Sequence, residues 1–275
     1  MYVGKPHSHN ADNEKTHPPK PKEPKDWEHY ELWKKIKEVL ENLPNIFESN
    51  LNITSAVNVT EIYAFGTVLS NVIEEEVVRS LNKAKREWDP ENKYCDYTFI
   101  RQPQAFPDVL LKNTNTDDIL MGIELKSWYL LAKEGEPSFR YRVTSSACTD
   151  RDLLVVVPWV LSNVVTGTPI VFKPFVISAK YAAEYRNYWW MYERKARGDR
   201  EIRSPSSVTP YPPSRDVIDD EPTVDSGHNF GRLARTGIMD DWVENCKKEK
   251  VLGIEVKRWI EFFKKASESS TTCLQ

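Results

Sequence analysis

The stretch FPDVLLKNTNTDDILMGIELKSWYLL, residues 106–131, decides the fold that we expect for this chain. It consists of two largely apolar runs on either side of NTNTDD, a loop of residues that favour turns. This pattern predicts a β-hairpin with strands over 108–113 and 118–131. The second strand is otherwise apolar, yet it contains Glu124 and Lys126.

The charged residues of the hairpin fall where they can meet. Asp108 precedes the turn near Asn115 by seven residues and Glu124 follows it by nine, so antiparallel pairing places the two carboxylates close together. Because side chains alternate along a strand, Glu124 and Lys126 project from the same face. Two carboxylates suit Mg²⁺, which prefers hard oxygen ligands. A lysine beside them can orient or deprotonate an attacking water, or neutralise charge on a phosphate.

Pro107-Asp108 followed by Glu124-Leu125-Lys126 resembles the PD-(D/E)xK motif of restriction-endonuclease-like nucleases. The resemblance implies that Asp108, Glu124 and the backbone carbonyl of Leu125 bind a divalent metal ion, Mg²⁺. It also implies that Lys126 serves the nucleophilic water, so that Asp108, Glu124 and Lys126 are the catalytic residues.

The resemblance covers residues 60–180 and carries an expectation for the fold. It implies an α/β protein with a restriction-endonuclease-like core, in which helices flank a central mixed β-sheet, with helical and irregular extensions. The family core runs helix, three strands, helix, strand. This order is similar to a helix at 66–85, strands up to residue 131, a helical or irregular piece near 143–150 and a strand at 153–161.

Glu-x-Lys alone has little specificity, because the chain contains it five times. Of the other four, one lies in the polar N-terminal tail, one in a loop, and two in charged helices where residues two apart do not share a face. The alternative for Glu124 and Lys126 is an exposed cross-strand ion pair, worth under about 1 kcal/mol. The apolar neighbours ILMGI and SWYLL instead indicate a covered strand, where charges without a function would be costly.

A helix is expected over 60–88, with a break near Gly66. Its apolar face consists of Leu69, Val72, Ile73, Val77 and Leu81. At 100° per residue, Glu76 falls inside this arc, whereas Glu74 and Glu75 point elsewhere.

A glutamate on a buried face needs a partner, which can be a cation, a hydrogen-bond donor or a metal ion. Many nucleases of the family contribute an acidic residue from the first core helix, and the resemblance makes Glu76 the candidate for that catalytic role. The alternative is a structural ion pair with Arg79 or Lys83.

The rest of the chain divides into three parts. Residues 1–25 lack apolar periodicity and are expected to form a disordered or extended arm, solvated rather than gripping DNA. The resemblance makes residues 26–197 the expected nuclease core with its N-terminal helix, which we expect Asp26 to cap and Pro44 to end. Residues 198–275 form an irregular segment and C-terminal helices packed on the core, and are candidates for DNA recognition. Further strands are expected over 95–101, 153–161 and 169–178, and further helices over 179–197, 239–250 and 253–269.

Two segments are candidates for contacts to double-stranded DNA. YERKARGDREIR offers cations for phosphates, and DSGHNFGRLARTG can present side chains to base edges. The candidate residues are Arg194, Lys195, Arg197, Asn229, Arg232 and Arg235. The alternatives are a solvated helix end for the first segment and a plain turn for the second.

The composition excludes several classes of function. The net charge of −3 argues against a protein that coats nucleic acid through bulk basicity, but it leaves DNA cleavage open, because carboxylates for metal and cations for phosphate cancel in the total. No apolar segment approaches the roughly 20 residues of a membrane span. The four cysteines show no C-x-x-C spacing, so we expect no structural zinc, no disulfide and a cytoplasmic protein. No phosphate-loop or dinucleotide motif is present, so no nucleotide cofactor is expected.

These patterns together lead us to expect a Mg²⁺-dependent type II restriction-like endonuclease that hydrolyses phosphodiester bonds of double-stranded DNA. A palindromic target would imply a homodimer with one site for each strand. The alternatives are a repair or recombination nuclease of the same fold and a catalytically inactive DNA-binding module.

Overall fold

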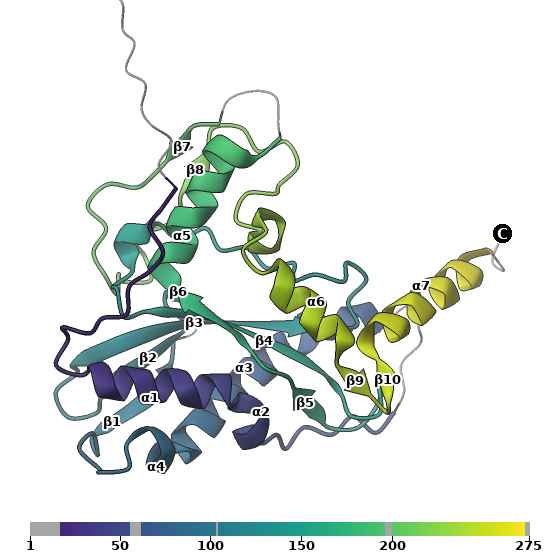
Figure 1. Cartoon of the computed structure of the whole chain (residues 1–275), viewed down its shortest axis with the longest axis horizontal. Coiled ribbons are helices and arrows are strands. Elements are labelled where there is room, and N and C mark those ends of the chain that lie inside the picture. The colour runs from purple at the N-terminus through teal and green to yellow at the C-terminus, as the bar shows by residue number, and fades with distance from the viewer. Residues whose placement is uncertain (1–16, 56–61, 103, 196–199, 273–275) are drawn as a thin grey trace, which may run out of the picture.

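The computed structural model describes residues 17–55, 62–102, 104–195 and 200–272. Helices flank a mixed β-sheet (Figure 1). The helices are α1 (Tyr30–Glu41), α2 (Leu43–Ile46), α3 (Phe65–Lys83), α4 (Lys85–Trp88), α5 (Ala179–Tyr188), α6 (Asp240–Lys248) and α7 (Val256–Thr272). The strands are β1 (Tyr97–Arg101), β2 (Val109–Asn113), β3 (Ile119–Tyr129), β4 (Leu153–Leu161), β5 (Pro169–Val171), β6 (Phe175–Ser178), β7 (Ile202–Arg203), β8 (Glu221–Pro222), β9 (Lys250–Val251) and β10 (Ile254–Glu255).

The predicted hairpin is confirmed and lies within the main sheet. The main sheet runs β1-β2-β3-β4, and both β5 and β6 pair with β4. Strands β1, β2 and β3 are antiparallel neighbours, whereas β3 and β4 run parallel. Val109 faces Ile123 across the hairpin, and an irregularity between Leu111 and Lys112 shifts the register near the turn.

Strand β4 forms the centre of the core, because all nine of its residues are buried. The single strand expected over 169–178 is instead two strands, β5 and β6, which pair with opposite ends of β4. Prolines explain the division. Pro174 has no N–H to give to a ladder, and Pro158 of β4 lies between the segments that pair with β6 and β5.

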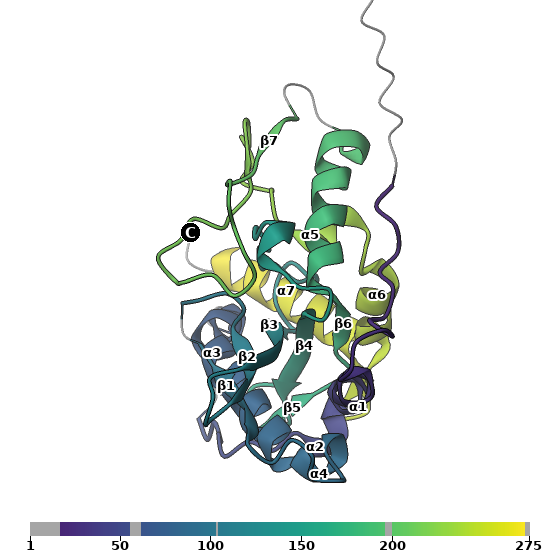
Figure 2. The same ribbon diagram turned by 90° about the vertical axis from the view of Figure 1, so that its left-hand side faces the viewer.

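The helices cover the two faces of the sheet. Helix α3 packs against β1 and β3, and α1 contacts β6 and α4. Figure 2 shows α3 and α1 on opposite sides of the sheet. Helix α5 contacts β4 and β6. Helices α6 and α7 contact each other, and α7 extends outward beyond the sheet (Figure 1).

Several expected helix boundaries are wrong. Asp26 lies in a turn, and His29 precedes the first residue of α1. Helix α1 ends before Pro44, which occupies the first turn of α2, where a missing N–H costs nothing. The helix expected over 60–88 is described from residue 62, as a 3-10 turn followed by α3 and α4. The turn gives way to α3 at Phe65, next to the break expected near Gly66, and a second break lies at Ala84.

The described part of the N-terminal arm runs over the protein surface and is mostly exposed, with only Pro18 and Pro24 half-buried. Residues 17–25 have no regular secondary structure and run alongside α5 (Figure 2). The ring of His17 lies 5.3 Å from that of Tyr185 and 4.9 Å from that of Tyr188. The arm was expected to be disordered or extended, and its residues 1–16 lie outside the described residues.

A buried carboxylate holds the hairpin against the rest of the protein. Asp152, which is fully buried, accepts hydrogen bonds from the N–H of Gly122 at 2.7 Å, the N–H of Thr149 at 2.6 Å and the hydroxyl of Tyr211 at 2.9 Å. A Cβ at position 122 would lie 2.3 Å from Cγ of Pro107, so only glycine allows this close contact. Asp152 therefore connects β3, the start of β4 and the irregular C-terminal segment.

We predict that Asp152→Ala destabilises the protein by about 3 kcal/mol, because it leaves buried donors without an acceptor. The matched control is Asp150→Ala. Its carboxylate is 74% exposed in an ion pair with Lys180, so its loss should cost under about 1 kcal/mol. Urea unfolding measures both, and equal shifts of the two midpoints would contradict the role of Asp152.

Candidate active site

The hairpin leaves a notch at the edge of β3, because β2 begins only at Val109. Beyond Ile123, this edge of β3 has no paired backbone from β2. The side chain of Asp108 takes that place, since its Oδ2 accepts the N–H of Leu125 at 3.0 Å. The N–H and C=O of a strand residue lie on the same edge, so the carbonyl of Leu125 also faces this notch.

The predicted convergence of the three charged residues is confirmed. Nζ of Lys126 lies 2.9 Å from Oδ2 of Asp108 and 2.8 Å from Oε1 of Glu124. The N–H of Asp108 donates to Oε2 of Glu124 at 3.3 Å. One cationic group thus touches both carboxylates at once.

The burial of this cluster contradicts the alternative of an exposed ion pair. The side chain of Glu124 is 9% exposed, and those of Asp108 and Lys126 are 23% and 22% exposed. Charges held this far from water need strong compensation, which here comes from the opposite charges and backbone donors of the cluster itself.

The surroundings of Glu124 raise its pKa toward neutral pH. Burial raises the pKa of Glu124 to about 7, the ammonium of Lys126 works against this rise, and the nearby charge of Asp108 adds to it. For Lys126 the balance is different. Burial lowers the pKa of Lys126, but the Glu124 and Asp108 carboxylates outweigh burial and raise it. Lys126 is therefore a cation in this arrangement, suited to orienting water and neutralising charge.

The donor set fits Mg²⁺. Two carboxylates reach one cationic position, and the carbonyl of Leu125 faces the same notch. Mg²⁺ is commonly held by one or two carboxylates and completes its octahedron with water and phosphate oxygens. No group of three or more His, Cys, Asp or Glu side chains that could hold a metal occurs among the described residues. A metal here would therefore depend on Asp108, Glu124 and the Leu125 carbonyl.

Glu76 does not join this site, which corrects its assignment as the acid of the first core helix. Glu76 is buried as expected, but both of its carboxylate oxygens accept hydrogen bonds from Nη1 of Arg79, at 3.1 and 2.9 Å. The structural ion pair with Arg79 is what the fold contains.

Glu74, which was expected to point elsewhere, is the acid of α3 whose pKa is affected by the charges of the site. Burial raises the pKa of Glu74, the charge of Lys126 lowers it, and the charge of Asp108 raises it. Val78 is buried and Val72 only half-buried, so the buried face of α3 is rotated toward Glu74 relative to the predicted arc. A sequence pattern that included Val78 would have placed Glu74 at the margin of that face.

The candidate DNA-binding residues do not meet the charged cluster. The guanidinium of Arg194 lies 3.4 Å from the ring centre of Trp190, Lys195 is exposed, and Arg197 lies outside the described residues. The helix expected to carry them is α-helical only in α5 and continues as a π-helix over Trp189–Glu193.

In the second candidate segment, residues 225–237, the candidate side chains make contacts within the protein. Arg235 donates to the side chain of Asn229 and lies 3.6 Å from Glu136, while Arg232 is half-buried. Of the five candidates that the structure describes, none pairs with Asp108, Glu124 or Lys126.

Comparison of the chain with protein-family models, with curated proteins and with solved structures found no match. Over the described residues, no helix has the length and apolar character of a membrane span. The chemistry of the notch is therefore the main guide to function.

We predict opposite shifts of the Glu124 pKa in two variants. Lys126→Met removes the cation that stabilises the carboxylate and should raise the pKa of Glu124 above about 7. Asp108→Asn removes a repelling charge and should lower it. Carbon-13 NMR of labelled glutamate side chains measures the titration, with Glu124→Gln for assignment and Glu76→Gln as the control that leaves it unchanged. A lower pKa in Lys126→Met would contradict the arrangement.

Proposed function

We propose that this protein is a Mg²⁺-dependent type II restriction-like endonuclease that hydrolyses phosphodiester bonds of double-stranded DNA. The observation that supports it most is the contact of one cationic group with two carboxylates of the β2–β3 hairpin, at a sheet edge that a carbonyl also faces. Phosphoryl chemistry needs such a grouping, because a metal ion, a positioned water and a positive charge must meet at one phosphate.

The order of elements supports a restriction-endonuclease-like core. Helix α3 is followed by β1, β2 and β3, and then by the parallel strand β4. Between β3 and β4 the only helical element within the described chain is the 3-10 turn Ser145–Ala147, which departs from the full helix of the family core. The site does not depend on that helix, since its residues come from the β2–β3 hairpin.

Each residue of the notch has a role in this proposal. Asp108 and Glu124, with the carbonyl of Leu125, would hold Mg²⁺, which supplies a lowered pKa for its bound water and charge stabilisation at the phosphate. Lys126 orients the attacking water and neutralises charge that develops on the scissile phosphate. Gly122 and Asp152 keep Pro107 and the hairpin in register, so that Asp108 remains opposite Glu124.

The proposed substrate has consequences for assembly. A palindromic duplex presents two equivalent strands, and a homodimer with two-fold symmetry would place one notch on each. Sequence recognition would come from segments outside the hairpin, including the irregular part after residue 200.

Plasmid cleavage tests the proposal directly. The purified protein with Mg²⁺ should cut unmodified plasmid into discrete fragments, and Asp108→Ala or Lys126→Ala should lower the rate by at least about 100-fold. Lys257→Ala is the matched control, because Lys257 belongs to another Glu-x-Lys in the same chain and is exposed. Glu76→Gln should retain activity.

The outcomes separate the alternatives. A smear in place of bands would indicate a repair or recombination nuclease without sequence selectivity. No Mg²⁺-dependent nicking at any concentration would refute the proposal and leave a DNA-binding module. Full activity of Asp108→Ala or Lys126→Ala would refute the assigned site.

We also predict that Mg²⁺ binding strengthens with pH. At a pH below the Glu124 pKa of about 7, a proton competes with the metal for the Glu124 carboxylate. At a higher pH the carboxylate is deprotonated and can bind the metal. The apparent affinity for Mg²⁺ should therefore rise about tenfold from pH 6 to pH 8. Isothermal titration calorimetry measures it. Equal affinities at both pH values would show that Glu124 is not a ligand.

A further inference from the structure

Arg101 is a second cationic group beside the notch, and the proposed chemistry does not use it. It is the last residue of β1 and pairs with Val109, the residue after Asp108. The next residue also adjoins the site, since the N–H of Gln102 donates to the carbonyl of Asp108 at 2.6 Å. Arg101 therefore lies beside the first residue of β2, on the strand next to the hairpin that carries the proposed metal-binding carboxylates.

Two side chains of α3 hold the guanidinium of Arg101. Its Nη2 donates to Oδ1 of Asn71 at 3.1 Å and to Oε2 of Glu74 at 3.2 Å. The side chain of Glu74 is 12% exposed, and that of Arg101 is 28% exposed. The charges of Lys126 and Asp108 also act on the Glu74 carboxylate that holds Arg101.

The guanidinium of Arg101 has hydrogen-bond donors that Asn71 and Glu74 do not use. Its contacts with Asn71 and Glu74 use Nη2 alone, and within the described residues Nε and Nη1 have no partner. A guanidinium has five N–H donors in a planar fork that matches the oxygens of a phosphate. Since the Arg101 side chain is 28% exposed, its pair with Glu74 does not close it off from a ligand.

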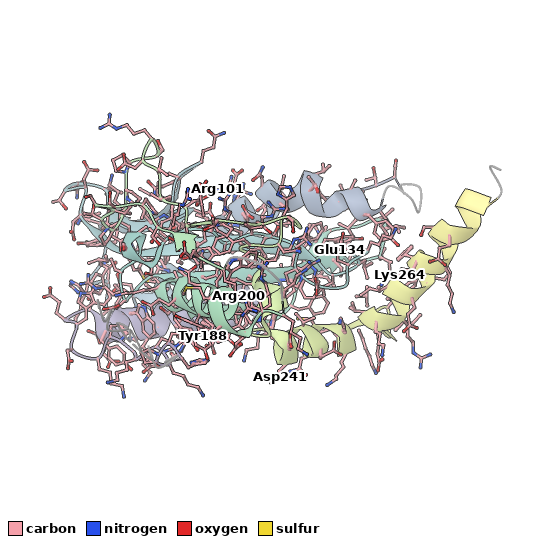
Figure 3. The ribbon with its side chains drawn as sticks, turned by 90° about the horizontal axis from the view of Figure 1, so that it is seen from above. Arg101, Glu134, Tyr188, Arg200, Asp241 and Lys264 are labelled. Atoms are coloured by element: carbon pink, nitrogen blue, oxygen red, sulfur yellow. The ribbon has the colours of Figure 1, made fainter. Side chains whose placement is uncertain are left out.

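We infer that Arg101 binds a backbone phosphate of the DNA substrate, and that Asn71 and Glu74 are positioning residues that hold its guanidinium beside the notch. This inference rests on the proposed function for its substrate. It also differs from the expected recognition surface on the helix that ends near Arg194. Figure 3 shows Arg101 and Tyr188, at the end of α5, on opposite sides of the molecule.

Salt-dependent DNA binding tests the inference. A protein cation that contacts one phosphate contributes about 0.9 to the slope of log K against log salt concentration. With a short fluorescent duplex in EDTA, where the metal-dependent cut is prevented, Arg101→Met should reduce the magnitude of that slope by about 0.9. The matched control is Arg79→Met, which removes another partly exposed arginine paired with a glutamate of α3 and should leave the slope unchanged.

A double variant separates phosphate binding from a purely structural role. Arg101→Met with Glu74→Gln removes the unpaired carboxylate that the single change leaves behind. If Arg101 binds phosphate, the slope stays reduced in the double variant. If Arg101 only neutralises Glu74, the double variant returns to the wild-type slope, and that result would overturn the inference. An unchanged slope in Arg101→Met would overturn it as well.

The plasmid assay keeps this inference distinct from the proposed function. A wild-type protein that cuts plasmid, together with an unchanged slope in Arg101→Met, refutes the role of Arg101 alone. A wild-type protein that does not cut, but whose DNA binding loses slope in Arg101→Met, refutes the nuclease and retains the phosphate contact.

Discussion

The structure depends on the antiparallel register between β2 and β3, which forces two carboxylates into one notch. Val109 faces Ile123, so the residues immediately beyond this pair, Asp108 and Glu124, meet at the place where β2 begins. Two negative charges so close together and so little exposed repel each other unless a cation lies between them. In this protein that cation is the ammonium of Lys126, which the strand alternation places on the same face.

The rest of the core keeps this register from slipping. A shift of one residue would turn Glu124 and Lys126 to the opposite face of the sheet. The shift would bring a residue with a side chain against Pro107 in place of Gly122, and it would break the hydrogen bond from the Gly122 N–H to Asp152, which directly precedes β4. The buried strand β4, parallel to β3, then fixes the hairpin in the sheet. The same contacts that stabilise the fold therefore define the geometry of the site.

Patterns with a short range were sufficient to predict the hairpin, the buried strand β4 and the meeting of Asp108, Glu124 and Lys126, because strand alternation and turn chemistry act within a few residues. What failed depended on distant contacts. The rotation of α3 about its axis is set by packing against β1 and β3, so a helical wheel selected Glu76 where the fold places Glu74. The split of residues 169–178 follows from pairing with both ends of β4, and His17 contacts the rings of Tyr185 and Tyr188 in α5, more than 150 residues later in the chain.

A crystal structure with bound Mn²⁺, as an anomalous scatterer in place of Mg²⁺, would test the role of the notch most directly. We expect one anomalous peak about 2.1 Å from a carboxylate oxygen of Asp108, an oxygen of Glu124 and the carbonyl of Leu125. The ammonium of Lys126 should then have moved away from its position between the carboxylates, toward the metal-bound water. A notch in which Lys126 still bridges Asp108 and Glu124 at saturating Mn²⁺, with the ion bound elsewhere, would show that the cluster is a structural ion pair.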